Sequence, residues 1–467
     1  MNDMHRYDIA IIGAGVAGIF AAHELVKDQP DLRVVLLEQG ADIAKRDCPI
    51  ISRKATGCVG CSSCAVMRGF GGAGAYSDGK FNFTTQFGGW LGEYLPDAAV
   101  MELIEYVDAV NRTFGAPGEM FSTRNEQADI IRRKAIGLDL HLLDARCKHI
   151  GTEKNRELLR NQYEWLRERV DLFCNTQVHS LNPEGGGFVL ETSRGTIQSE
   201  FVIAAPGRSG AEWFADQCRT LGLSLVNNQV DIGVRVELPA LVFKDITDAM
   251  YEAKLQYRTK GYRDIVRTFC MNPNGFVVTE NTDGIITVNG HSYADPARGS
   301  ENTNFALLVS NVFTSPFHEP YQYGKHIASL SNMLGGGVLV QRFGDLIDGR
   351  RTNAHRLIQG FVRPTLNATP GDLSLVLPKR HLDNIIEMIH VLDRLAPGTA
   401  NHDTLLYGVE VKFYSSRLKL TSELETEISG LFAVGDGAGI TRGLSQAGAS
   451  GVHAARRILA HIGSKTK

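Results

Sequence analysis

The sequence predicts an α/β fold in which a discontinuous, Rossmann-like dinucleotide-binding domain is interrupted by an α+β domain and carries a helical insertion. Residues 8–38 have the pattern of a strand, a glycine turn, a helix and a second strand. Residues 430–439 place another glycine-rich turn directly after an apolar strand. Since these segments lie at opposite ends of the chain, the domain that they form must be discontinuous.

The first of these turns has the spacing G-x-G-x-x-G. An apolar run over 7–12 leads into it, and a helix is expected over 16–26. The first glycine permits the sharp exit from the strand, the second lets backbone N–H groups approach a pyrophosphate, and the third lets the helix pack close to the sheet. The predicted contact residues are Gly13, Ala14, Gly15, Ala17 and Gly18.

An acidic residue closes the second strand of this unit. The strand over 32–37 ends at Glu38, twenty positions after Gly18, with Gln39 next to it. We expect the Glu38 carboxylate to accept both ribose hydroxyls of a dinucleotide. An acidic residue here disfavours a 2′-phosphate, so the ligand is FAD or NAD(H) rather than NADP(H).

The C-terminal segment favours FAD. Residues 430–439 include Gly435 and Asp436 after an apolar strand, and Gly443 and Leu444 then begin a helix expected to reach about residue 462. This pattern resembles the second FAD signature of flavoproteins built like glutathione reductase or p-hydroxybenzoate hydroxylase. The resemblance implies that the Asp binds the ribityl chain and that the helix N-terminus points at the flavin.

Two further segments are expected in the same domain. The glycine-rich run over 69–80 resembles the loop that passes beside the FAD phosphates and flavin in this superfamily, although a plain flexible loop is the alternative. The apolar strand over 200–205 ends in small residues and resembles the superfamily's middle FAD motif. The predicted contacts are Gly72, Ala73, Gly74, Ser77, Ala205 and Gly207.

The order of these segments predicts the domain boundaries. Apolar residues at three- and four-residue intervals indicate helices between 96 and 170, and a mixed or antiparallel sheet is expected after 225. The predicted parts are a first FAD part (1–95), a helical insertion (96–170), a second FAD part (171–225), a substrate or cap domain (226–404) and a C-terminal FAD part (405–467).

Composition predicts an ordinary globular protein with a small-molecule substrate. The 467 residues carry a formal net charge of −3, which gives no electrostatic reason to bind nucleic acid or an anionic membrane. The first apolar run has no cationic flank and no cleavage site, so it is expected to be a βα unit rather than a signal peptide. We expect the cytoplasm as the location.

Four of the eight cysteines crowd into a short stretch: Cys48, Cys58, Cys61 and Cys64. Their thiolates suit an iron–sulfur cluster or a closed zinc site, although the order differs from the bacterial ferredoxin run. A dithiol that exchanges electrons with a flavin is a third possibility, and free structural thiols are a fourth. The sequence favours none of these over the others.

Polar residues of the middle region are the candidates for catalysis. His291 is the natural proton donor or acceptor, although a lone His in a turn is more often a surface residue. Arg267 is a second candidate. Glu410, Lys412 and Tyr414 alternate along an expected strand and therefore share one face. The alternative is that these charges only keep a half-exposed edge strand soluble.

Longer motifs support a family resemblance over nearly the whole chain. They are Arg-Thr-Phe-Cys-Met at 267–271, Val-Asn-Gly-His-Ser at 288–292, Asn-Thr-Asn-Phe-Ala-Leu-Leu-Val at 302–309, and the glycine-rich motifs at 71–80 and 434–444. Together they resemble a family of bacterial proteins described only as uncharacterised FAD-dependent dehydrogenases. The resemblance implies FAD and a Rossmann-like FAD domain interrupted by a substrate domain.

The sequence therefore predicts an FAD-dependent oxidoreductase that transfers two electrons between a small-molecule substrate and the flavin. No second strand–G-x-G-x-x-G–helix unit is present, so NAD(P)H, if it is the donor, is a diffusible one. The alternatives are a flavin monooxygenase, an FAD-dependent RNA-modifying enzyme and a non-catalytic flavin-binding partner. The chain has a net negative charge and offers no basic tract that would bind RNA.

Overall fold

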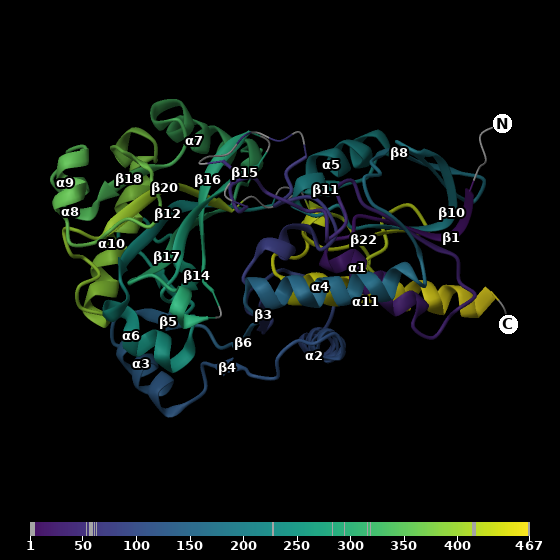
Figure 1. The fold of residues 1–467 in the computed structure, drawn as a ribbon, viewed down its shortest axis with the longest axis horizontal. Helices are drawn as coiled ribbons and strands as arrows, with labels where there is room; N and C mark the ends of the chain where they lie inside the picture. The colour runs from purple at the N-terminus through teal and green to yellow at the C-terminus, as the bar shows by residue number, and fades with distance from the viewer. Residues whose placement is uncertain are drawn as a thin grey trace. The chain divides into compact units, whose positions relative to one another are not determined.

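The computed structural model describes residues 5–465 apart from 53, 56–58, 60, 62, 227, 283, 294, 315, 318 and 413–416. The chain forms two compact units (Figure 1). Unit 1 comprises Met1–Glu119, Lys148–Asn228 and Tyr414–Lys467, and unit 2 comprises Met120–Cys147 and Gln229–Phe413. Both units are therefore built from segments that are far apart in the sequence.

Unit 1 is organised around a seven-stranded sheet with the order β7-β2-β1-β10-β9-β8, in which β22 also pairs with β10. The strands β7, β2, β1, β10 and β22 are parallel; β2 and β22 are buried throughout, and so are the last four residues of β1 and of β10, as expected for a sheet covered on both faces. Strands β8 and β9 add an antiparallel hairpin. The strands are β1 (His5–Ile12), β2 (Val34–Leu37), β7 (Asp171–Phe173), β8 (Val178–Glu184), β9 (Gly187–Thr192), β10 (Gly195–Ala204) and β22 (Leu431–Ala433).

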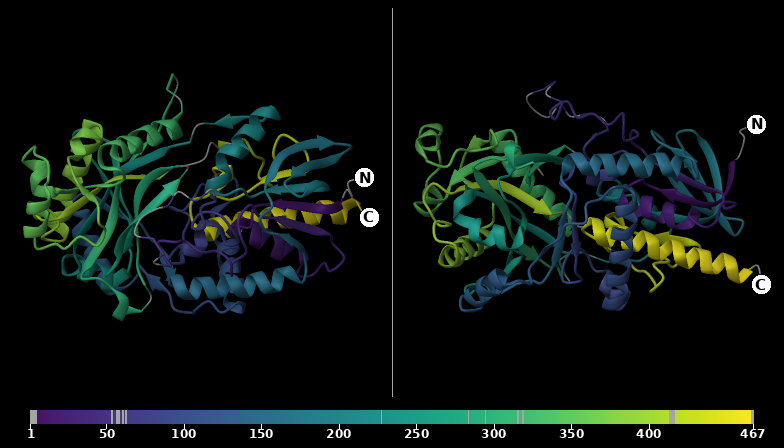
Figure 2. Two further views of the ribbon diagram at one scale, coloured as in Figure 1. Left: turned by 45° about the horizontal axis from the view of Figure 1, so that its top comes forward. Right: turned by 60° about the horizontal axis from the view of Figure 1, so that its bottom comes forward.

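Two helices of unit 1, α1 and α11, pack against each other and lie side by side in every view (Figure 2). A Cβ on Gly451 of α11 would overlap the carbonyl oxygen of Ala17 in α1, so only glycine allows this close crossing. The helices of the unit are α1 (Val16–Val26), α2 (Asp97–Thr113), α4 (Thr152–Arg167), α5 (Ala211–Thr220) and α11 (Leu444–Lys465). The short strands are β3 (Lys80–Phe83), β11 (Leu225–Val226) and β21 (Arg417–Leu418), and β6 (Arg146–His149) spans a unit boundary.

Unit 2 contains an eight-stranded sheet with the order β19-β18-β20-β12-β17-β14-β13-β5. Apart from the parallel pair of β18 and β19, its neighbouring strands are antiparallel. The strands are β5 (Leu140–Leu142), β12 (Val230–Pro239), β13 (Leu255–Arg258), β14 (Ile265–Asn272), β17 (Asn302–Asn311), β18 (Leu339–Arg342), β19 (Thr369–Pro370) and β20 (Leu405–Lys412). A separate hairpin joins β15 (Phe276–Thr282) to β16 (Ile285–His291), and β4 (Phe121–Ser122) pairs with β6.

The two faces of this sheet differ in chemistry. Ile232, Val234 and Val236 of β12 belong to the apolar core, which also contains buried residues of α3, α6 and α10. The alternate residues Asp231 and Arg235 point to the other face and are fully buried as well. The helices of unit 2 are α3 (Glu126–Ile136), α6 (Ala240–Met250), α7 (Pro320–Gly335), α8 (Phe343–Ile347), α9 (Ala354–Gln359) and α10 (Lys379–Leu395).

The units divide the chain differently from the predicted boundaries. Within the expected helical insertion over 96–170, α2 and α4 belong to unit 1, whereas α3 belongs to unit 2. The expected boundary after 404 precedes β20, which is an interior strand of the unit 2 sheet. The helix α7 ends at Gly335, because Gly336 caps it with φ +70°, and 339–342 form β18.

Among the described residues, no helix combines the length and the apolar character that a bilayer crossing requires.

Candidate cofactor site

The turn after β1 has the geometry that its glycines predict. Gly13 has φ +102°, and a Cβ there would overlap the carbonyl oxygen of Ala205 at the end of β10. A Cβ on Gly18 would overlap the Gly13 carbonyl oxygen. Gly15, in contrast, faces open space, and no side chain caps the N-terminus of α1 that follows it. The first N–H groups of α1 are thus available to an anion, as helix termini generally allow.

Glu38 lies at the end of β2, as predicted, but its carboxylate also organises the protein backbone. Its Oε2 accepts a hydrogen bond of 2.9 Å from the Ala14 N–H, and its Oε1 accepts bonds of 2.8 and 2.9 Å from the Gly40 and Gly69 N–H groups. A carboxylate has about four acceptor positions. Three are already used, so this arrangement has room for one ribose hydroxyl rather than the expected two.

Arg46 anchors the loop that leads to the glycine-rich run, a role that no local sequence pattern indicates. The guanidinium is buried and donates five hydrogen bonds of 2.7–3.2 Å to the carbonyl oxygens of Ala65, Val66, Gly69 and Phe70. Burial lowers the pKa of Arg46 to about 10, against the opposing charge of Glu38. At neutral pH Arg46 is therefore still a cation that crosslinks residues 65–70.

The glycine-rich run forms a short 3₁₀ helix, η1 (Gly72–Tyr76), and lies against two other cofactor motifs. A Cβ on Gly72 would lie 3.2 Å from the Cα of Gly15. A Cβ on Gly74 would lie 3.0 Å from a methyl carbon of Leu444, the first residue of α11. The run therefore forms a short helical turn that lies against Gly15 and Leu444.

The C-terminal motif at 435–439 lies against the same part of unit 1. A Cβ on Gly435 would lie 3.0 Å from the Ala17 side chain, and a Cβ on Gly437 would lie 2.8 Å from the Gly207 nitrogen. Asp436 is half-buried, and its Oδ1 accepts a hydrogen bond of 2.7 Å from Thr441 Oγ1, while its Oδ2 adds further acceptor capacity.

Close approaches at Gly13, Gly72, Gly74, Gly435 and Gly437 thus connect the ends of β1, β10 and β22 with η1 and the helices α1 and α11. They define the surface that we call the cofactor cradle: Gly13, Gly15, Glu38, Gly72, Ala73, Gly74, Gly207, Asp436, Gly443 and Leu444. All of these except Glu38 are half-exposed, although the strands that carry them are buried. Gln39 lies next to Glu38 and donates a 3.5 Å bond to Ser209. Ala14, Ala17, Gly18 and Ala205 lie beneath the surface, and Ser77 bonds the Gly74 carbonyl oxygen.

The residues present suit an adenine dinucleotide. The cradle combines an uncapped helix N-terminus, a carboxylate with spare acceptor capacity and close backbone approaches that only small residues allow. In the first turn of α11, the buried Ser445 hydroxyl has no hydrogen-bond partner among the described residues. A ligand at this helix N-terminus would supply such a partner. The fold and this surface fit an FAD-dependent oxidoreductase.

Comparison with protein families supports this class. Residues 230–413 match the family described as "FAD-dependent protein, C-terminal domain-like", and residues 8–48 match "Lycopene cyclase protein". An uncharacterized protein of Clostridium beijerinckii is 27% identical over 474 residues, which cover 96% of this chain and 80% of the relative. Since FAD is a redox cofactor, the predictions of FAD, of an oxidoreductase and of an enzyme are confirmed at the level of class.

Solved structures with distant similarity were also found. Glycine oxidase from Geobacillus kaustophilus is 15% identical, with a TM-score of 0.37, over 99% of this chain and 95% of that chain. L-proline dehydrogenase from P. horikoshii is 12% identical, with a TM-score of 0.44, over 98% of this chain and 94% of that chain. TM-scores this low carry no conclusion about function.

The expected cysteine cluster is not supported. Cys48 and Cys64 are half-buried and Cys61 is exposed, all three as free thiols, while Cys58 lies outside the described residues. In the part of the chain that the structure describes, no group of three or more His, Cys, Asp or Glu side chains could hold a metal ion.

The candidate catalytic residues all lie in unit 2, where two of them meet at one ring. Arg267 forms an ion pair with Asp231, and its guanidinium lies 5.4 Å from the centroid of the Phe269 ring. Lys412 Nζ lies 5.8 Å from the same centroid. His291 lies at the end of β16 instead, where it stacks on Phe276 with 5.9 Å between ring centroids.

The alternative of a half-exposed edge strand for Glu410 and Lys412 is wrong, because both residues are almost completely buried; β20 pairs with β12 as far as Lys412 and with β18 over 405–408. Both side chains are buried, and Lys412 Nζ lies 2.7 Å from Glu410 Oε1. Glu410 also accepts two bonds, of 2.7 and 2.8 Å, from the buried Arg235 guanidinium. Burial by itself would raise the pKa of Glu410, but the charges of Arg235 and Lys412 outweigh this effect and lower it. Tyr414 lies outside the described residues.

Proposed function

We propose that the protein binds FAD at the cofactor cradle of unit 1 and transfers two electrons between a small-molecule substrate and the flavin. The observation that carries this proposal is the convergence of glycine-rich motifs from 13–18, 72–74 and 435–444 on one half-exposed surface. The cytoplasmic location remains a prediction from the sequence. The same holds for the expectation that neither nucleic acid nor membrane is a partner.

Each part of the cradle has a chemical role in this proposal. The N-terminus of α1 beyond Gly15 binds the pyrophosphate with backbone N–H groups and the helix dipole. Glu38 accepts a ribose hydroxyl, and Asp436 accepts a hydroxyl of the ribityl chain. The first N–H groups of α11, after Gly443, stabilise negative charge at the flavin end. When bound, FAD supplies the hydride-accepting chemistry that protein side chains lack.

Within unit 2, we propose His291 as the group that donates or accepts the substrate proton. An imidazole titrates near neutral pH and therefore suits this task. Arg267 and Lys412 are each within an ion pair, so they are better suited to holding charge than to exchanging protons. We propose that they hold positive charge on the face of the unit 2 sheet to which Asp231 and Arg235 point.

Flavin content of two matched variants tests the cradle. Gly15→Glu adds a carboxylate where the pyrophosphate would bind, and Gly118→Glu adds the same carboxylate at an exposed, open position of the same unit. After saturation with FAD and gel filtration, we expect the first variant to lose its visible flavin absorbance and the second to keep it. Equal flavin content in both folded variants would contradict the proposed site.

Activity separates the reaction types. Anaerobic reduction of a dye by substrate is the expected outcome for a dehydrogenase. NAD(P)H oxidation that requires both substrate and O₂ would instead indicate a monooxygenase.

A further inference from the structure

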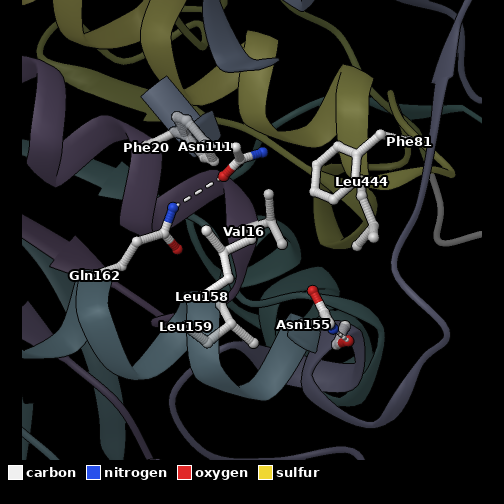
Figure 3. Close-up of a pocket in the computed structure, with 10 residues that line it drawn as sticks. Val16, Phe20, Phe81, Asn111, Asn155, Leu158, Leu159, Gln162 and Leu444 are labelled. Carbon is white, nitrogen blue, oxygen red and sulfur yellow. Dashed lines mark hydrogen bonds between the residues drawn. The ribbon is translucent and has the colours of Figure 1, made fainter. Parts of the chain in front are cut away.

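The cavity that adjoins the cofactor cradle is too small for a substrate. Gly74 and Leu444, two cradle residues, form part of its wall, and its volume is about 10 Å³ (Figure 3). A volume of roughly 10–15 Å³ holds one water molecule. Its polar lining consists of Asn111, Asn155 and Gln162, and none of the described residues that line it is charged. The substrate of the proposed reaction therefore has to bind at another side of the cradle.

The segment 87–94 borders the cradle at the start of α11. A Cβ on Gly443, a cradle residue, would lie 3.6 Å from the Cα of Gly88. The Trp90 N–H donates a hydrogen bond of 2.8 Å to the Ile440 carbonyl oxygen, just before the same helix. These contacts, all within unit 1, hold the segment against the end of the cradle that we propose for the flavin.

Arg417 lies next to two aromatic rings of this segment. Its guanidinium carbon is 5.6 Å from the centroid of the Trp90 ring and 5.9 Å from the centroid of the Tyr94 ring. Both aromatic residues are half-exposed, and the Arg417 side chain is 18% exposed. An arginine that contacts aromatic rings keeps both its charge and its planar fork of N–H donors. The three side chains thus combine apolar ring surface with a fixed positive charge.

Glu93 shows how a carboxylate docks on Arg417. Its Oε2 accepts a hydrogen bond of 2.6 Å from Arg417 Nη2, and its Oε1 accepts one of 3.3 Å from Nη1. This two-bond geometry is the one that a guanidinium offers to carboxylates in general. The Glu93 side chain is 54% exposed, and ion pairs with an exposed partner contribute little to stability. Another carboxylate can therefore take the place of Glu93 at low cost.

We propose that Trp90, Tyr94 and Arg417 bind the substrate, and that the substrate is a carboxylate attached to a planar apolar group. The carboxylate replaces Glu93 on the guanidinium, and the planar group lies against the aromatic rings. We call these three residues the carboxylate site. The substrate role rests on the proposed function, since it names the substrate class for the cofactor cradle. The binding of a carboxylate does not require FAD.

Isothermal titration calorimetry of the full chain with benzoate tests the site. Benzoate is a planar carboxylate, and benzamide is a neutral analogue of nearly the same shape. We expect benzoate to bind, with or without FAD, and benzamide to bind about tenfold more weakly or worse, because it lacks the charge that pairs with Arg417. Failure of benzoate to bind at millimolar concentration, or equal affinities for the two compounds, would overturn the carboxylate site.

Two variants test whether the binding depends on these residues. Arg417→Lys keeps the charge but loses the planar fork, so the dissociation constant for benzoate should rise on the order of tenfold. Glu93→Gln removes the competing carboxylate, so the dissociation constant should fall on the order of threefold. A merely structural ion pair would give no such gain. Glu164→Gln is the matched control, because Glu164 is 50% exposed and pairs with Arg167 elsewhere in unit 1.

The affinities are compared on variants whose circular dichroism matches that of the parent protein. Unchanged benzoate affinity in either folded variant would overturn the proposal, and so would an equal gain in Glu164→Gln. If Arg417→Lys does not fold, Glu93→Gln decides the matter. Failure of the proposed function would be recognised separately, because Gly15→Glu would then retain its flavin while the titrations without FAD kept the expected order of affinities.

Discussion

The buried His381 should make the protein unusually sensitive to mild acid. The residue lies in the first turn of α10 and is only 3% exposed, and neither ring nitrogen has a hydrogen-bond partner in the described part of the chain. Burial lowers its pKa to about 4, despite the opposing effect of Asp264. The folded protein therefore keeps His381 neutral at a pH where an unfolded chain protonates it.

The sign and size of the effect follow from linkage. In the unfolded chain a His has a pKa near 6.5. Above that pH, His381 is neutral in both states and does not change the free energy of unfolding. Below that pH, the unfolded state binds a proton that the folded state does not bind. Stability then falls by about 1.4 kcal/mol for each pH unit until the folded pKa is reached. The loss amounts to roughly 2 kcal/mol at pH 5 and roughly 3 kcal/mol at pH 4.

Urea unfolding at pH 7.5 and pH 5, followed by circular dichroism, measures this loss. His381→Leu removes the titrating group, so it should lose roughly 2 kcal/mol less than the parent protein between the two pH values. His326→Leu, at an exposed position of α7, should behave like the parent. If the parent and His381→Leu lose stability equally between the two pH values, the reasoning about burial is refuted.

Two further predictions concern buried arginines. Arg46→Lys replaces a guanidinium that makes five carbonyl bonds with an ammonium that has three donors, so amide hydrogen exchange should accelerate over 65–72, and unchanged exchange there would contradict the anchoring role. Arg235→Leu leaves Glu410 buried without its bidentate partner and should lower the free energy of unfolding by about 3–5 kcal/mol in urea titrations. If Arg235→Leu unfolds in urea with the midpoint and slope of the parent protein, the ion pair between Arg235 and Glu410 is not needed for stability.

Local motifs made the cofactor site predictable. Gly13, Gly15 and Gly18 act within one strand–turn–helix unit, where the backbone geometry required depends on residues close in sequence. The position of α1, which the glycine spacing places over 16–26, agrees with the structure. The pairing of this unit with Asp436 was predictable only because the C-terminal motif carries its own glycine pattern.

Other parts of the site have no local signal. Arg46, Asn111 and Ser445 look like ordinary polar residues in the sequence, and only the folded structure shows that they are buried. The alternation of Glu410 and Lys412 in the sequence fits an edge strand as well as it fits an interior strand. Only the packing of the folded chain around the end of β20, where this strand pairs with β12, makes them buried residues, and strand order is a non-local property.

The sequence by itself determined that the chain contains a dinucleotide turn, an acidic strand end and a C-terminal flavin motif, because each depends on short-range spacing of glycine and carboxylate. Only the tertiary structure decided which polar side chains are buried and which atoms they meet. Burial and hydrogen bonding depend on contacts between residues that are separated in the sequence, such as Arg235 and Glu410, and no short sequence pattern encodes those contacts.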